Sequence, residues 1–168
     1  TLPTGGRLFQ TTNGTDADGP EITATGTAVT NGSGVVIFDP DVDFFGSPSF
    51  NYSVSDPSAA TSSETVSITV TNVNDAPVAV NDALATTDST PLSGNVLAAS
   101  PTAPDSDVDG DPIVVTAVNG VAGDVGVAVT LVPSGALLTL NADGTFDYDP
   151  NGQFASLAEG ATFDDTFT

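Results

Sequence analysis

The chain has 168 residues and a formal net charge of −21, from 22 acidic residues and the single basic residue Arg7, yet 39% of its residues are hydrophobic, enough for a packed core. One basic residue cannot neutralise a row of phosphates, so we expect neither nucleic acid nor an anionic membrane surface as a partner. The absence of Cys and His removes thiol nucleophiles, histidine general bases and the usual sulfur and imidazole metal ligands.

Four segments have patterns typical of β-strands. Residues 50–55 and 65–71 alternate apolar and polar side chains, which predicts half-buried strands, with Phe50 and Tyr52 facing inward. Residues 113–118 and 137–140 are aliphatic runs of strand length. The turn dipeptides between strands are Asn31-Gly32, Asp109-Gly110, Asn119-Gly120 and Asp143-Gly144. Because no window of helical length shows an apolar stripe, we predict an all-β fold of antiparallel β-sandwiches.

Two parts of the chain are similar to each other. Residues 2–8 match residues 132–138, and residues 38–41 match residues 148–151. The spacing between the matched segments differs, which indicates diverged copies with loop insertions. A junction rich in Asn, Asp and Pro then predicts two units, residues 1–76 and 77–168. Each unit lacks counterparts of some strands of the other, so we expect both sandwiches to be incomplete at the chain ends, completed by a longer tandem array or by a neighbouring copy.

Motifs in the second unit resemble those of a known family. Residues 90–97, 105–111, 116–120 and 137–146 occur in the order found in bacterial cadherin-like and VCBS-type repeats of giant secreted or surface-anchored adhesins. In the first unit, residues 44–46, 50–56 and 74–77 are similar to the end of a related repeat.

The resemblance implies tandem immunoglobulin-like (cadherin-like) sandwiches with Ca²⁺ at or near their junctions. Residues 1–76 would be the C-terminal part of one cadherin-like repeat, and residues 77–168 a VCBS/cadherin-like repeat lacking its last strands. Residues 99–104 replace an Asn-Asp pair that often precedes the acidic loop in such repeats, which removes one potential ligand.

An acidic loop is the first candidate metal site. Asp105, Asp107, Asp109 and Asp111 place four carboxylates at alternate positions, and Ca²⁺ takes six to eight oxygen ligands. Alternate side chains of a straight strand lie about 6.5 Å apart, so the segment must curl if it binds one ion. The spacing excludes an EF-hand, because the twelfth position from Asp105 is not a bidentate Glu. The alternative is a solvated acidic turn.

The junction is the second candidate. Asn74, Asp75 and Asp82 lie along it, and Asp56 ends a strand that we expect to finish near the same pole. Together their oxygens could hold a Ca²⁺ ion that clamps two sandwiches, although Asn-Asp before Pro is also an ordinary turn. Secondary candidates, which read more simply as charged turns, are Asp16, Asp18, Glu21, Asp39, Asp41 and Asp43.

Catalysis is not expected, because a Ser nucleophile would lack a His or Lys base and the acidic residues lie in turns without a Trp sugar platform. We predict a non-catalytic, calcium-stiffened structural or adhesive segment of a bacterial extracellular or cell-surface protein. Its expected partners are neighbouring repeats, copies of itself, and surface glycans or proteins. No apolar stretch is long enough to insert into a membrane. The alternatives are a filament subunit joined by strand exchange and a carbohydrate-binding accessory module of a secreted hydrolase.

Overall fold

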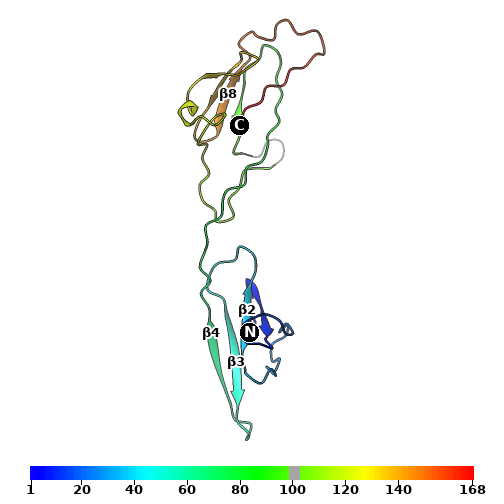
Figure 1. Ribbon diagram of the computed structural model, residues 1–168, viewed down its shortest axis with the longest axis vertical. Coiled ribbons are helices and arrows are strands. Elements are labelled where there is room, and N and C mark those ends of the chain that lie inside the picture. The colour runs from blue at the N-terminus through cyan, green and yellow to red at the C-terminus, as the bar shows by residue number, and fades with distance from the viewer. Residues whose placement is uncertain (99–102) are drawn as a thin grey trace. The chain divides into compact units, whose positions relative to one another are not determined.

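The computed structural model describes residues 1–98 and 103–168, and these form two compact units, Thr1–Asn74 and Asp75–Thr168 (Figure 1). Both units are built of antiparallel strands and loops, and the helical content of the described residues is one 3₁₀ turn, η1 (Ala122–Asp124). The all-β prediction is confirmed. Most of the segment 99–104, from which a ligand was expected to be missing, lies outside the described residues.

The strands of the first unit are β1 (Gly6–Gln10), β2 (Val36–Pro40), β3 (Ser49–Ser55) and β4 (Thr61–Ser67). They form two antiparallel pairs, β1–β2 and β3–β4. Leu8 of β1 and Phe50 of β3 are buried. Gln10 is also buried, and its side-chain amide donates to the C=O of Ala28 at 3.2 Å and accepts the N–H of Thr30 at 2.8 Å. These bonds satisfy the buried amide and fix the long β1–β2 connection to the end of β1.

The β3–β4 hairpin corrects two details of the strand prediction. The strand predicted at 65–71 begins earlier, because the ladder of β4 starts at Thr61 in a polar stretch. Val66, Ile68 and Val70 are half-buried between exposed residues, as the alternating pattern predicts. Phe50 points inward, but Tyr52 is 46% exposed, so the prediction that it faces inward is wrong. Among the described residues no second layer covers the outer half of this hairpin, and its side chains therefore remain in solvent.

The strands of the second unit are β5 (Leu92–Asn95), β6 (Val129–Thr130), β7 (Leu137–Leu140) and β8 (Thr145–Asp149). They form one antiparallel sheet in the order β5-β8-β7-β6. Its inner face carries the core, in which the buried apolar side chains are Val118, Leu131, Leu138, Leu140 and Phe146. Phe167 packs against this core, with its ring 6.2 Å from that of Phe146, so residues near Thr168 cover part of the sheet.

The predicted strand at 113–118 is extended but has no ladder of its own among the described residues. Its pairing consists of the Val115 N–H donating to the C=O of Ala142 and a bridge between Val118 and Val121. That bridge closes the predicted Asn119-Gly120 turn, where both residues have positive φ. Alternating apolar residues therefore identified inward-facing backbone but not the ladder partner, which periodicity does not encode.

The internal similarity seen in the sequence reappears in the strand register. In the first unit Leu8 lies opposite Phe38 and Gly6 opposite Pro40; in the second unit the matching residue Leu138 lies opposite Tyr148. The β1–β2 and β7–β8 pairs are thus copies of one element. They differ in their connections, because residues 11–35 join the first pair and residues 141–144 join the second.

Candidate metal centre

The acidic loop is held against the start of the second unit. Val78 and Ser106 exchange two backbone hydrogen bonds, of 2.8 and 3.1 Å, which align residues 75–80 antiparallel to residues 105–109. Two carboxylates extend this pairing. The N–H of Asp75 donates to Oδ2 of Asp109 at 2.7 Å, and the N–H of Val80 donates to Oδ1 of Asp105 at 2.8 Å.

Within the loop, the chain curls as metal binding would require. The N–H of Gly110 donates to the C=O of Asp107, and Gly110 has a φ of 78°, a left-handed conformation that favours glycine. Oδ1 of Asp107 accepts the N–H groups of Asp109 at 2.9 Å and of Asp111 at 3.3 Å. These bonds turn the segment about the Asp107 side chain.

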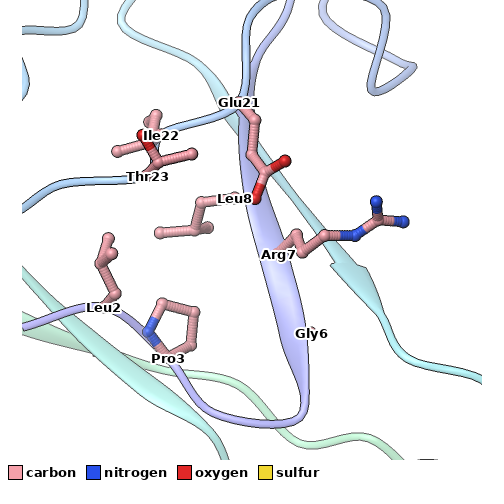
Figure 2. A pocket seen from close by; sticks show the side chains of 8 residues that line it. All are labelled: Leu2, Pro3, Gly6, Arg7, Leu8, Glu21, Ile22 and Thr23. Carbon is pink, nitrogen blue, oxygen red and sulfur yellow. The ribbon is translucent and has the colours of Figure 1, made fainter.

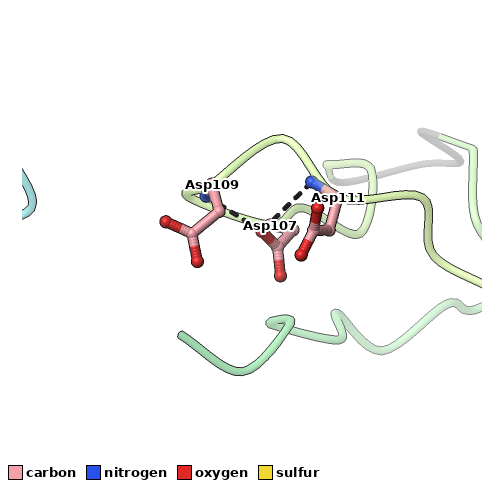
Figure 3. Close-up of side chains that lie close together, drawn as sticks. All are labelled: Asp107, Asp109 and Asp111. Atoms are coloured by element: carbon pink, nitrogen blue, oxygen red, sulfur yellow. Dashed lines mark hydrogen bonds between the residues drawn. The ribbon is translucent and has the colours of Figure 1, made fainter. Parts of the chain in front are cut away.

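The curl gathers three carboxylates. Asp107, Asp109 and Asp111 each contribute an oxygen, these oxygens lie within 4.8 Å of one another, and the side chains project to the same side of the loop (Figure 3). Asp107 and Asp109 are half-buried and Asp111 is exposed. Three like charges this close repel one another. Carboxylate oxygens are the donors that hard cations such as Ca²⁺ prefer, so the donor set fits the predicted ion.

Asp105 lies apart from this cluster and beside Asp82. Oδ1 of Asp82 is a buried oxygen with no hydrogen-bond partner among the described residues. Burial raises the pKa of Asp82, and the neighbouring charge of Asp105 raises it further. An orphaned carboxylate oxygen next to a second carboxylate is a position that a cation would relieve. The four acids expected around one loop are therefore divided between a cluster of three and a pair.

Asp56 is not brought to the junction. It lies at the tip of the β3–β4 hairpin, where its Oδ1 accepts the N–H groups of Ser58 and Ala60 at 2.9 Å each. From this tip β4 runs back antiparallel to β3, and Asn74 follows β4 in the chain. The expected convergence of Asp56 with Asn74 is wrong, because β3 runs away from the junction and β4 returns to it. Asp56 acts as a turn residue.

Among the secondary acids of the first unit, Asp18 and Asp39 have local side-chain partners. Asp18 accepts hydrogen bonds from Thr11 and Thr12, and these bonds hold the pKa of Asp18 below its usual value. Asp39 forms an ion pair with Arg7 at 3.0 Å. Both arrangements are those of charged turns and strand pairs.

A concavity of about 170 Å³ lies beside β1 (Figure 2). Leu2, Leu8 and Ile22 supply its apolar wall, and the guanidinium of Arg7 extends away from them. Glu21 is its one acidic lining residue. Glycoside hydrolysis requires two carboxyl groups facing across a cleft, and this concavity does not present them.

These units are immunoglobulin-like β-sandwich repeats. The chain belongs to the bacterial cadherin-like domain family, which it matches over residues 74–168, and residues 3–69 match the bacterial Ig domain family. Comparison with curated proteins found no match, and neither did comparison with solved structures. The predicted resemblance to bacterial cadherin-like repeats and the predicted tandem sandwich fold are confirmed, whereas the VCBS type stays a prediction.

Membership of these families indicates a structural or adhesive repeat, a class that is generally non-enzymatic. Cadherin-like domains generally bind Ca²⁺, and domains of both families typically belong to surface or extracellular proteins. Among the described residues, no helix has the length and apolar character needed to cross a bilayer.

Proposed function

We infer that this chain is a calcium-stiffened, non-catalytic repeat segment of a bacterial extracellular or cell-surface protein. The observation that carries the proposal is the group of three carboxylate oxygens, from Asp107, Asp109 and Asp111, within 4.8 Å of one another. Family membership supports the structural role, and the acidic cluster supports the choice of Ca²⁺ as the ion.

The proposed ligands connect two parts of the second unit. Asp107, Asp109 and Asp111 would hold the ion, and Asp75 lies next to them through its bond to Asp109. Bound Ca²⁺ supplies two positive charges, which offset the repulsion among the carboxylates. Asp107 orients the loop through its two backbone hydrogen bonds, and Asp109 ties the loop to residue 75. The start of the unit therefore stiffens when the loop is neutralised.

The Asp82–Asp105 pair is a second place where a cation would stabilise the unit. Asp105 already anchors the backbone of Val80, and the orphaned Oδ1 of Asp82 is available as a further ligand. Both residues belong to the segments that Val78 and Ser106 align. A cation here would act on the same junction of segments as one bound at Asp107, Asp109 and Asp111.

Thermal unfolding of the full chain in chelator, in Ca²⁺ and in Mg²⁺ tests the proposal. We expect Ca²⁺ to raise the melting temperature well above the value in chelator. Mg²⁺ should raise it less, because Mg²⁺ demands near-octahedral geometry and loses its water reluctantly. Equal midpoints in the three solutions would refute calcium binding and leave only the structural role that the families indicate.

The partners that fit this role are neighbouring repeats of a tandem array. Most of a long array acts as spacer, because each repeat contacts only its neighbours. Atomic force measurements on concatenated copies would test this role directly. Unfolding forces that rise with Ca²⁺ support a load-bearing spacer, whereas forces that do not respond to Ca²⁺ contradict stiffening.

A further inference from the structure

The second unit begins with a segment that lies outside its hydrophobic core. Among the described residues, the core side chains and those packed against them begin at Leu92, the first residue of β5. Residues 75–91 precede this point, and their side chains are exposed except for Val80 and Asp82, which are half-buried. Because burial of apolar surface is the main stabilising contribution in a fold, this segment, here called the strap, depends on other contacts for its attachment.

The strap is attached near its beginning, by hydrogen bonds to residues 105–109. Val78 and Ser106 exchange two backbone bonds in an isolated bridge. On either side of the bridge a strap N–H donates to a carboxylate, and these pairs are Asp75 with Asp109, at 2.7 Å, and Val80 with Asp105, at 2.8 Å. Hydrogen bonds of this kind contribute little net stability, because water replaces them when they open.

The rest of the strap bonds to itself. Residues 83–91 are exposed, including the apolar side chain of Leu84 at 46%. The hydroxyl of Thr86 donates to the C=O of Thr90 at 2.7 Å, and the hydroxyl of Thr87 donates to that of Thr90 at 2.6 Å. These bonds lie within the strap and move with it, so they offer no resistance to its detachment.

Detachment would stop at β5. Residues Leu92–Asn95 form a four-residue antiparallel ladder with β8. Leu92 and Val96 also pack against the buried core. The chain therefore changes at Leu92 from a segment held by a few solvent-accessible hydrogen bonds to a strand held by a ladder and by apolar contacts.

Like charges face one another across the attachment. Asp75 is bonded to Asp109, and Asp82 lies close enough to Asp105 for the charge of Asp105 to raise the pKa of Asp82. Oδ1 of Asp82 is buried without a hydrogen-bond partner among the described residues. Release of the strap separates these charges and returns this oxygen to water, so both effects favour opening when no metal is bound.

The strap is also where tension enters the second unit. The two units are successive parts of one chain and divide between Asn74 and Asp75, so a pull from the first unit reaches Asp75 before any other residue of the second. We propose that residues 75–91 are a releasable strap, which detaches from residues 105–109 under tension while β5, β6, β7 and β8 stay folded. Fully extended, the strap spans at most about 60 Å, and this is the upper limit of the length that its release adds.

Calcium would regulate the release, and this part of the inference rests on the function proposed above. Asp109 belongs to the carboxylate cluster and also accepts the N–H of Asp75, so an ion at the cluster would hold the partner of the strap in place. The release itself needs no metal. Measurements in chelator therefore test the strap separately from calcium binding.

Stretching single molecules of the full chain in chelator tests the strap. The chain has no Cys, so Val78→Cys with Ser106→Cys provides a single disulfide between residues that a β-bridge already pairs. With this disulfide reduced, we expect a lengthening step of at most about 60 Å at forces below those that unfold the core. With it oxidised, residues 79–91 lie inside a closed loop and the step should disappear, and reductant should restore it.

A matched disulfide in the core is the control. Thr139 and Asp147 lie opposite each other in the β7–β8 ladder, so Thr139→Cys with Asp147→Cys crosslinks the sheet without touching the strap. Its oxidised form should keep the early lengthening step.

Amide exchange of the unsubstituted chain in chelator measures the same opening without force. The N–H groups of Val78 and Val80 should be at least about tenfold less protected than those of Leu131 and Asn141, which bond beside and within the sheet. The reason is that the strap opens locally, whereas the amides of the sheet wait for the unit to unfold.

Equal protection of strap and sheet amides overturns the proposal, because the strap would then open only with the core. Absence of the early step in the reduced Val78–Ser106 variant also overturns it. So does a step that survives oxidation of that variant, because the added length would then come from another part of the chain. Loss of the step in the oxidised Thr139–Asp147 control overturns it too, because the core itself would then be the part that lengthens.

Discussion

Replacing Asp107 and Asp109 by Asn separates the electrostatic role of the acidic loop from its hydrogen bonds. Each Asn keeps a side-chain oxygen able to accept the backbone bonds that Asp107 and Asp109 now accept. The substitution removes two of the three charges within 4.8 Å of one another. Without metal this relieves repulsion, and with Ca²⁺ it removes ligands. We therefore expect opposite effects on stability in the two conditions.

The magnitudes follow from the geometry. Two unit charges 4.8 Å apart repel by about 0.9 kcal/mol in water, and salt at physiological strength roughly halves this value, so relief of the three pairs stabilises the variant by about 1.3 kcal/mol in chelator. Extracellular modules bind Ca²⁺ with Kd values of about 10⁻⁴–10⁻³ M, so 10 mM Ca²⁺ stabilises the wild-type unit by about 1.4–2.7 kcal/mol. For a domain of this size that is a Tm shift of about 6–20 °C.

Calorimetric melting of both proteins, in chelator and in Ca²⁺, measures these shifts. The variant should melt above the wild type in chelator and should lose the calcium shift, so that in Ca²⁺ it melts level with or below the wild type. A matched control, Asp88→Asn with Glu159→Gln, removes two exposed charges of the same unit away from the loop and should keep the full calcium shift. A variant that melts below the wild type in chelator would refute the repulsion argument, and one that keeps the calcium shift would place the ion elsewhere.

Two further predictions concern the second unit. Leu138→Ala empties part of the core at a fully buried position and should lower the free energy of unfolding by about 3–5 kcal/mol in urea titrations, whereas Val127→Ala, at a 51% exposed side chain, should change it by less than about 0.5 kcal/mol. In the folded unit the pKa of Asp82 is raised above its ordinary value of 3.8. In chelator, the free energy of unfolding should therefore increase as the pH falls through the raised pKa towards 3.8. Asp82→Asn should remove this gain and raise the Tm at pH 7.

The sequence predicted the all-β class well because the alternation of apolar and polar residues reports which side chains of a strand face inward. It placed Phe50 in a strand with an inward-facing side chain and Leu138 in an aliphatic run of strand length, and the match between the two copies anticipated the shared register of β1–β2 and β7–β8. It did not supply ladder partners. Alternation could not foretell that residues 113–118 have no ladder of their own within the described part of the chain, or that β4 begins in a polar stretch.

The candidate site was predicted in composition but not in arrangement. The need for a curl was recognised, and the structure provides it through the side chain of Asp107. The pairing of Asp82 with Asp105 depends on the alignment of residues 75–80 with 105–109, which the sequence does not encode locally. Asp56 was misplaced because its position depends on the direction of β3. The incompleteness of both units at the chain ends stays a prediction.

The two copies of the shared element also allow one substitution to be compared in two surroundings. Gly5 and Gly135 occupy matching positions, just before β1 and β7, with φ of 73° and 86°. A Cβ at Gly5 would lie 1.9 Å from the ring of Phe44, whereas at Gly135 it would lie 3.2 Å from the flexible side chain of Gln153. Both Gly→Ala changes pay a similar conformational cost, about 1–2 kcal/mol, for a left-handed backbone.

The difference between the two variants therefore reports mainly the contact with the Phe44 ring, because the flexible side chain of Gln153 can move aside. Gly5→Ala forces Phe44 off the strand start, and we expect it to cost about 1–3 kcal/mol more than Gly135→Ala, as overpacking against a ring usually does. Each unit contains one tyrosine, Tyr52 in the first and Tyr148 in the second, so fluorescence of Tyr148→Phe and Tyr52→Phe backgrounds follows each unit separately during urea unfolding. Equal losses of unfolding free energy in the two variants would show that the Phe44 ring moves aside at little cost. A larger loss for Gly135→Ala would contradict the equivalence of the two copies on which the comparison depends.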